Sequence, residues 1–193
     1  MRLAEYKIQR VRLATALDRE ADFIPAMSAE KAALEAIRYQ GIVCASFLLS
    51  RPLGGYYVTN IIDDWVPFTG VIKMSALVDR RHFGGYNLVY LPRYLDPDDE
   101  FFDLSDDEVQ ALFFGALQRM YPELEPADML AFRVSRVRQV LALSTMNYSE
   151  SLPPRSTSVK GLYLVNSAHI VNGTLNVNET VQLAEDALGE LLN

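Results

Sequence analysis

With 193 residues, of which 50% are hydrophobic and 22% charged, the chain has the composition of a globular protein that can bury one substantial core. Its formal net charge of −7 disfavours nucleic acid as a partner, because phosphate backbones attract clustered lysine and arginine. The sequence holds no run of about 18 apolar residues, the length that a membrane span needs. The single cysteine, Cys44, lies in an apolar run and is expected to be a buried structural thiol. These features predict a soluble, cytoplasmic protein without a membrane span.

The first predicted elements are one helix and a group of four strands. Ser28 precedes a run of good helix formers, and Gly41 stands where such a helix would stop. The segments that follow are dense in β-branched and aromatic residues and are separated by glycine or proline, as is typical of strands. The predicted strands span 42–50, 56–63, 70–79 and 86–95. The short links between them favour antiparallel pairing.

A long helix and a fifth strand are predicted next. Ser105 and Glu108 have the spacing of a capping box, and apolar residues then repeat every three or four positions as far as Met120. The segment 129–143 alternates apolar and polar residues, which predicts another strand. The chain then continues as an extended segment toward its last element.

The last segment is predicted to be a strand over 161–165, a polar loop and an amphipathic helix. Asn176 or Asn178 can cap this helix. Its expected buried stripe consists of Val181, Ala184, Leu188 and Leu191. Taken together, the elements predict a single α+β domain over 1–193, with a mixed, mainly antiparallel sheet of about six strands and three or four flanking helices.

The usual catalytic motifs are not found in this sequence. Its two histidines, His82 and His169, lack metal-ligand spacing, so no metal site is expected. No G-x-S-x-G, P-loop or G-x-G-x-x-G motif is present. The final strand, loop and helix can nevertheless hold an anion, because a helix N-terminus presents unpaired N–H groups and partial positive charge. The alternative is an ordinary capped C-terminal helix.

Four stretches carry a resemblance to a known family: "YQGIVCASFLLSRPLGGYYVTNIIDDWVPFTGVIKMSALVD", "GGYNLVYLPRYLDPDDEFFDLSDDEV", "RVRQVLALSTMNYSESLPP" and "GLYLVNSAHIVNGTLNVNETV". In their order and in their residues, these stretches resemble the C-terminal half of the flavin-containing amine oxidase and protoporphyrinogen oxidase-like superfamily, over about Ala33 to Leu188. The resemblance implies a substrate-binding domain over 31–150 and, over 151–193, a segment that completes an FAD domain. Residues 1–30 match poorly.

The resemblance also implies a cofactor, a partner and a function. FAD is the implied cofactor and a small molecule the implied substrate. In the family a Rossmann unit binds the FAD pyrophosphate through G-x-G-x-x-G, so a separate Rossmann-type chain or domain is the expected partner. The chain is expected to be the substrate-binding and flavin-closing part of an FAD-dependent oxidoreductase, inactive without that half. The alternative is a stand-alone, non-catalytic α+β binding or interaction domain derived from the same fold.

The resemblance assigns roles to individual residues. Cofactor contacts fall on the loop and the start of the last helix: Asn166, Ser167, Gly173, Asn176, Asn178 and Val181. Many family members have Gly-Glu or Gly-Asp where this chain has Asn166-Ser167. Substrate contacts fall on Gln139 and Tyr148, and Lys73 corresponds to a lysine that lies beside flavin N5 in some relatives. The alternative for Lys73 is a lysine on the solvent side of a strand.

Aromatic and basic residues add further candidates. Tyr56 and Trp65 are candidates for a substrate cavity, although their residue types favour the alternative that they are buried core aromatics. Arg133, Arg136 and Arg138 form a basic run that can contact an acidic substrate or a cofactor phosphate. The alternative for this run is a solvated face with one paired member.

Overall fold

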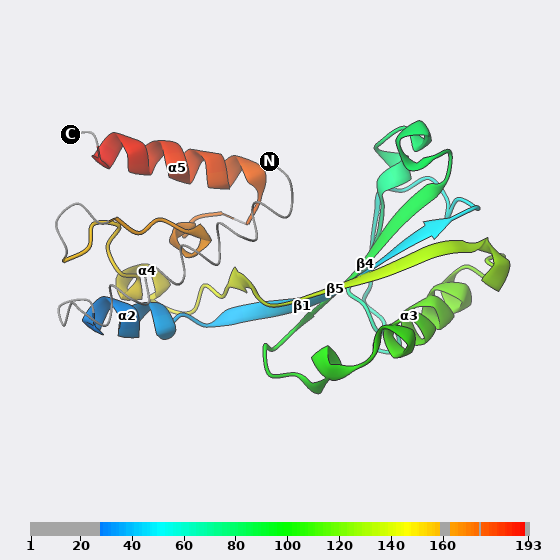
Figure 1. Cartoon of the computed structure of the whole chain (residues 1–193), viewed down its shortest axis with the longest axis horizontal. Coiled ribbons are helices and arrows are strands. Elements are labelled where there is room, and N and C mark those ends of the chain that lie inside the picture. The colour runs from blue at the N-terminus through cyan, green and yellow to red at the C-terminus, as the bar shows by residue number, and fades with distance from the viewer. Residues whose placement is uncertain (1–27, 159–162, 174, 192–193) are drawn as a thin grey trace. The chain divides into compact units, whose positions relative to one another are not determined.

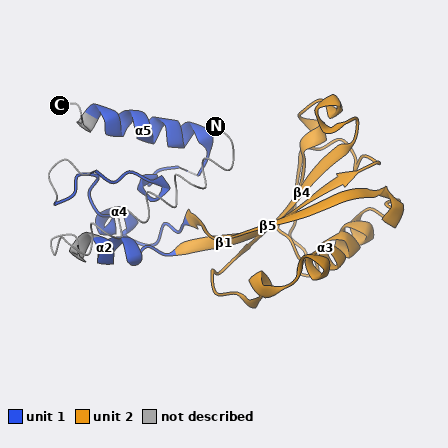
Figure 2. Cartoon of the chain, in the orientation of Figure 1, with its two compact units in different colours: residues 1–38, 142–193 blue, residues 39–141 orange. Residues whose placement is uncertain are grey.

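The computed structural model describes residues 28–158, 163–173 and 175–191. The chain divides into two compact units, which Figure 2 colours separately. Unit 2 is the continuous segment Tyr39–Leu141, and unit 1 joins Met1–Arg38 to Ala142–Asn193. The expected single domain over 1–193, with its parts 31–150 and 151–193, stays a prediction.

Unit 2 is built on a five-stranded sheet with the order β2-β3-β4-β1-β5. The strands are β1 (Tyr39–Leu49), β2 (Val58–Asn60), β3 (Gly70–Lys73), β4 (Asn87–Leu95) and β5 (Met129–Ala142). β1 pairs with β4, β4 with β3, and β3 with β2, all antiparallel. The prediction of an α+β fold with a mainly antiparallel sheet is confirmed, with five strands in the sheet among the described residues.

Strand β1, which lies between β4 and β5, alternates strictly between two environments. Val43, Ala45, Phe47 and Leu49 are buried on one face, and the residues between them are half-buried on the other. Such alternation follows from the two-residue period of side chains along a strand. The register continues it across the sheet, since Phe47 lies opposite Val89 and Ser46 lies opposite Tyr90.

Helix α3 (Asp106–Met120) covers the buried face of the sheet, as Figure 1 shows. The predicted capping box is present: Ser105 Oγ accepts the Glu108 N–H, and the Glu108 carboxylate accepts the Ser105 N–H. The helix buries Val109, Phe113, Phe114 and Leu117 in the same core as the inward side chains of β1. Tilted and edge-on contacts between rings join the two layers, with Phe47 and Phe114 centroids 5.6 Å apart.

Gly41 is not the helix stop that the sequence suggested. Helix α2 ends earlier (Ser28–Glu35), and Gly41 lies within β1, opposite Leu95. A Cβ at this position would come within 2.6 Å of the Phe102 ring and 3.0 Å of the Arg138 carbonyl oxygen. The glycine therefore permits a close approach between β1, β5 and the Phe102 ring.

Two predicted strands are shorter than expected. The strand expected over 70–79 ends at Lys73, and a 3-10 turn over Met74–Ala76 follows. Ser75 Oγ accepts the N–H of Leu88, a group that a longer β3 would bond through its backbone. The strand expected over 56–63 is reduced to Val58–Asn60. The hydrogen bond between the Leu88 N–H and Ser75 Oγ competes with backbone pairing of β3 and β4, and β3 therefore ends before Ser75.

The described part of unit 1 is helical and irregular. It contains α2, α4 (Tyr148–Ser151), a 3-10 turn over Ser167–His169, and α5 (Val177–Leu191). The sixth strand expected over 161–165 is not found in its described residues, where Tyr163 forms only an isolated antiparallel bridge with Ser156. Residues 161 and 162 lie outside the described part of the chain. The segment expected to be extended contains α4, which begins after Asn147 in a left-handed conformation (φ 59°).

Helix α5 buries a different face from the one that the sequence predicted. Leu183 and Ala187 are buried, whereas Val181, Ala184 and Leu188 are exposed. The side chain of Leu191 lies outside the described ones. Both sets have helical spacing, so periodicity alone could not choose between them.

Candidate functional site

The face of the sheet away from α3 contains a pocket. We name it the open face, made by Ser46 and Leu48 of β1, Leu88 and Tyr90 of β4, and Ala131, Arg133 and Ser135 of β5. Together with Phe132 these residues line a pocket of about 460 Å³. No α-helix among the described residues of unit 2 packs on this face. The pocket combines leucine side chains and a tyrosine ring with hydroxyl groups and one cation.

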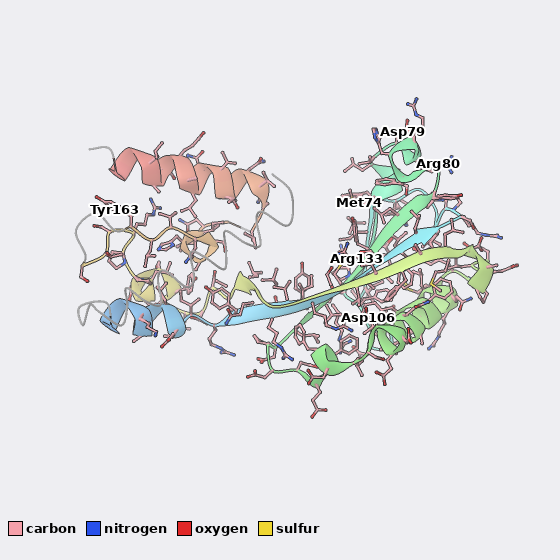
Figure 3. All side chains as sticks on the ribbon, viewed as in Figure 1. Met74, Asp79, Arg80, Asp106, Arg133 and Tyr163 are labelled. Carbon is pink, nitrogen blue, oxygen red and sulfur yellow. The ribbon has the colours of Figure 1, made fainter. Side chains whose placement is uncertain are left out.

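The three arginines of β5 divide between the two faces of the sheet. Arg136 bonds Asp106 (2.6 Å) and the Leu104 carbonyl, and Arg138 bonds Asp103 (2.9 Å), all on the α3 side. Arg133 points to the open face and makes no hydrogen bond or ion pair with any described residue. Figure 3 labels Arg133 on β5 and Asp106 at the start of α3. The expectation of a solvated face with one paired member was wrong, because two members are paired.

Lys73 lies on the α3 side of the sheet. It is opposite Val89, a residue of the core, and its side chain is only 5% exposed. Its Nζ donates to the Leu53 carbonyl oxygen (3.0 Å) and, at a longer distance, to Thr59 Oγ1 (3.4 Å). The alternative of a lysine on the solvent side of a strand is therefore wrong, and the role beside a flavin stays untested.

Tyr56 and Trp65 are not core residues, and they do not meet on the open face. Tyr56 is 79% exposed, with its ring centroid 5.9 Å from Lys73 Nζ. Trp65 is 39% exposed and stacks on the guanidinium of Arg119 in α3, 3.8 Å from the ring centroid. The structure brings Tyr56 and Lys73 together and places Trp65 on the outside of α3.

Gln139 and Tyr148 belong to different units. Gln139 is exposed on β5, at the same alternation as Arg133 and Ser135. Tyr148 is buried in unit 1, where its hydroxyl donates to the Ala168 carbonyl oxygen (2.8 Å). Of the four candidates for substrate contacts, only Gln139 shares an environment with the open face.

The loop candidates for cofactor contacts form a compact turn. Asn166 caps the 3-10 turn that contains Ser167, because Asn166 Oδ1 accepts the N–H of Ala168 (2.9 Å). His169 Nε2 lies 3.2 Å from the Pro153 carbonyl oxygen, which fixes the end of this turn. The side chain of Asn166 thus already serves a structural role.

The start of α5 brings the other cofactor candidates together. Asn176 caps the helix, since its Oδ1 accepts the Glu179 N–H (2.9 Å) and its carbonyl accepts the Thr180 N–H (3.1 Å). The backbone N–H groups of Val177 and Asn178 donate to no described residue. Gly173 packs against the same turn, where an added Cβ would lie 2.8 Å from the Glu179 carboxyl carbon. The candidate Val181 is exposed on the next turn.

A second pocket, of about 260 Å³, lies beside this turn in unit 1. Its polar lining includes Arg155, His169, Glu179 and Asp186. Two carboxylates make this pocket a better match for hydroxyl or amide donors than for an anion. The described residues hold no cluster of histidine, cysteine and acidic side chains that could bind a metal ion. None of the helices that are described combines the length and apolarity needed to cross a bilayer.

Cys44 also belongs to the open side of β1, next to the pocket. It lies opposite Pro92 and is half-buried, less enclosed than the buried structural thiol that the sequence suggested. Burial raises the pKa of the Cys44 thiol above its ordinary value, which keeps it protonated at neutral pH. This environment is typical of an unreactive thiol.

Sequence reasoning missed Ser46, Tyr90 and Ser135 as site residues. Ser46 and Tyr90 lie between buried residues of β1 and β4, and Ser135 follows the partly buried Val134 on β5, so the alternation along each strand is the signal that could have found them. What the sequence does not show is that these positions from strands far apart in the chain lie side by side. Strand order, which follows from tertiary pairing, makes them one surface.

No protein-family model matches the sequence, and no curated protein matches it. Several solved structures share its fold. An oxidoreductase from Methanosarcina mazei has a TM-score of 0.61 and 18% identity, covering 88% of this chain and 39% of its own. A proposed protoporphyrinogen oxidase from Exiguobacterium sp. 255-15 has a TM-score of 0.59 and 12% identity, covering 86% of this chain and 40% of its own.

A reduced UDP-galactopyranose mutase is similar over a smaller region. Its TM-score is 0.50 at 11% identity, and the match covers 62% of this chain and 26% of the mutase. The chain therefore spans less than half the length of each of these proteins. At such identities the likeness establishes the fold alone. The chain has the fold of a part of these larger proteins, two of which are described as an oxidoreductase and an oxidase.

Proposed function

We propose that this chain is the substrate-binding part of a flavin-dependent oxidoreductase, and that α5 helps to close the flavin site. The observation that carries the proposal is the fold shared with an oxidoreductase and a proposed protoporphyrinogen oxidase, over 86–88% of this chain but only 39–40% of theirs. The nucleotide-binding part then comes from outside this sequence, as a separate chain or as a further region of a longer one. The sequence resemblance to the amine oxidase and protoporphyrinogen oxidase-like superfamily supports the same assignment.

The open face supplies the substrate surface in this proposal. Leu48, Leu88 and the ring of Tyr90 offer an apolar bed, and Arg133 offers a cation that no described residue neutralises. Such a pocket suits a small molecule with an apolar body and one anionic group. Gln139 extends the same strand and can bind a polar end of the substrate.

The residues at the start of α5 fit a flavin. The N–H groups of Val177 and Asn178 donate to no described residue, and the helix N-terminus carries partial positive charge. These two groups would hold the pyrimidine edge of the ring, where reduction places negative charge. The flavin itself would accept a hydride from the substrate. The chain's contribution is to bind the substrate on the open face and to stabilise charge at the helix end.

Flavin content after complementation tests the proposal. The chain alone is expected to be colourless, because the G-x-G-x-x-G unit that holds the pyrophosphate is not in this sequence. Supplied with a nucleotide-binding part, in trans or by fusion to that of the Methanosarcina mazei oxidoreductase, it should bind FAD stoichiometrically. A folded, complemented protein that binds no flavin would instead support the stand-alone binding domain.

An Asn178→Asp variant of the complemented protein tests the role of α5. Asn176 is the cap, so this substitution leaves the cap intact and adds a negative charge beside the N–H groups at the start of the helix. A charge at a helix terminus is worth roughly 0.5–2 kcal/mol, which corresponds to about 10–40 mV for two electrons. We expect the flavin reduction potential to fall by that amount with unchanged helix content. Glu185→Gln, farther along α5 and outside the first turn, is the control and should leave the potential near its original value.

A further inference from the structure

A pocket of about 310 Å³ lies on the α3 side of unit 2, on the opposite side of the sheet from the open face. Its walls come from the loop at Pro52–Gly55, from the end of β3 and the turn after it, and from β4. Lys73 and Val89, paired across β3 and β4, form its floor. Asn87 holds the neighbouring strand end in place by donating to the Leu49 and Ser50 carbonyl oxygens (both 3.3 Å).

The lysine at this floor carries a buried charge with no opposite charge beside it. Lys73 is 5% exposed, and it forms no salt bridge with any described residue. Its acceptors are one carbonyl oxygen and one distant hydroxyl, and the rings of Tyr56 and Tyr121 lie 5.9 and 5.7 Å from its Nζ. Buried lysines are seldom found without a partner, since removing a charge from water is costly. An anion bound in the pocket would neutralise this charge.

The second charged side chain of the pocket, that of Arg80, is also positive. Arg80 lines the pocket and makes no side-chain hydrogen bond or ion pair with a described residue. The nearby carboxylate of Asp79 is already engaged by Arg81, at 3.0 and 2.7 Å. Figure 3 labels Asp79 and Arg80 on this turn. The lining residues include no acidic side chain, in a protein whose net charge is −7.

The pocket also contains neutral groups that can donate hydrogen bonds to an anion. Ser75 Oγ accepts the Leu88 N–H, which leaves its own hydroxyl proton available to a ligand. The backbone N–H groups of Gly54 and Gly55 donate to no described residue. Gly54 has φ +74°, and no atom lies within 4 Å of a Cβ added at either glycine, so the space beside the loop where side chains would stand is open. Consecutive N–H groups in such a loop can bind an anion.

We propose that this pocket is an anion-binding site, built to take a phosphate or carboxylate group of a small molecule between Lys73, Arg80 and the Gly54-Gly55 loop. The buried ammonium supplies the fixed charge, and the arginine at the rim supplies a planar pair of donors. A volume of about 310 Å³ accommodates the anionic group with a small body attached. The site lies across the sheet from the proposed substrate surface and shares no residue with it.

Titration of the isotope-labelled full chain with inorganic phosphate, and separately with acetate, tests the site at fixed ionic strength. The amide resonances of Gly54 and Gly55 should shift and saturate with at least one of the two anions. Saturation with phosphate alone assigns a phosphate ligand, saturation with acetate alone assigns a carboxylate, and saturation with both assigns a general anion site. Shifts that stay linear, or no shifts at these two glycines, would overturn the proposal.

Two neighbouring arginines provide a matched pair of variants. Arg80→Gln should raise the dissociation constant about tenfold, the usual effect of losing one charge-assisted hydrogen bond. Arg81→Gln removes the same charge one residue away, from a side chain bound to Asp79, and should change the constant less than about twofold. Equal effects of the two substitutions would show a general electrostatic attraction and would reject the site.

Lys73→Met tests the buried charge, since methionine has a similar volume. A folded variant should lose the saturable shifts at Gly54 and Gly55, and phosphate or acetate should no longer raise its unfolding temperature. If this variant does not fold, the comparison between Arg80→Gln and Arg80→Lys decides, with the lysine variant expected to recover most of the affinity. Unchanged binding by a folded Lys73→Met would contradict the proposal.

Discussion

The arginines of β5 show how a single step along a strand changes the role of a side chain. Arg136 and Arg138 fasten the strand to acidic residues at and before the start of α3, whereas Arg133 faces the other side of the sheet without a partner among the described residues. All three have the same chemistry and nearly the same sequence context. The face of the sheet alone separates a structural arginine from a candidate binding residue.

Asp128 is a residue whose charge stabilises the fold. Ser50 Oγ and the Glu125 N–H donate to its carboxylate, and Arg51 lies 3.1 Å away. The hydrogen bond from Ser50, followed by those from Glu125 and Arg51, lowers the pKa of Asp128 below the ordinary carboxyl value. A lowered folded-state pKa means that stability is present above the unfolded-state pKa and is lost as the pH falls through the folded-state value.

We therefore expect Asp128→Asn to lower the unfolding temperature at neutral pH. The difference from the original protein should shrink as the pH falls below about 4, the ordinary carboxyl range. Thermal unfolding followed by circular dichroism at several pH values measures it. Asp98→Asn, at an exposed position without an ion pair, should lower the unfolding temperature little at any pH. A pH-independent difference for Asp128→Asn would contradict this explanation.

At the scale of elements, the capping box of α3 sets where the core helix begins. Ser105 Oγ satisfies the N–H of Glu108, and the Glu108 side chain returns a bond to Ser105. Ser105→Ala should cost about 1 kcal/mol of unfolding free energy, the typical value of an N-cap. Ser105→Thr keeps the hydroxyl and should retain most of the stability. Urea unfolding of the two variants provides the measurement, and equal losses would show that packing rather than capping decides.

Helix α5 offers a direct choice between two faces. Leu183 is 7% exposed and Leu188 is 58% exposed, although the sequence favoured the face of Leu188. Leu183→Ala should cost about 2–3 kcal/mol because it removes buried apolar volume. Leu188→Ala should change the unfolding free energy by less than about 0.5 kcal/mol. A larger loss for Leu188→Ala than for Leu183→Ala in urea unfolding would instead support the face that was predicted from the sequence.

At the scale of the whole molecule, the two units differ in how the chain builds them. Unit 2 is continuous, and every residue of its hydrophobic core falls between Val43 and Leu124. Unit 1 is assembled from both ends of the chain. A continuous unit with its own core is expected to fold independently.

Expression of residues 39–141 alone tests this independence. The fragment contains nearly all of the five-stranded sheet, α3 and the aromatic contacts between them. We expect a cooperative unfolding transition and dispersed amide resonances. The full chain is the reference for both measurements. A fragment without a cooperative transition would mean that unit 2 depends on the segments that form unit 1.

Local signals in the sequence determined much of this fold. The capping box of α3, its apolar period, the alternation of β5 and the presence of strands at β1 and β4 were predicted, and all depend on neighbours within four residues. The positions of Asn176 at the start of α5 and of Lys73 on a strand were also visible in the sequence. Short-range hydrogen bonds and side-chain periodicity suffice for such features.

Tertiary structure decided the features that depend on a distant partner. β3 ends at Lys73 because Ser75 bonds Leu88, Gly41 is needed because Phe102 packs on it, and α5 turns Leu183 rather than Leu188 inward. The open face likewise exists only because strand pairing brings β4, β1 and β5 together. In each case several local patterns were compatible with the sequence, and the burial or hydrogen bond that selects one comes from residues far away along the chain.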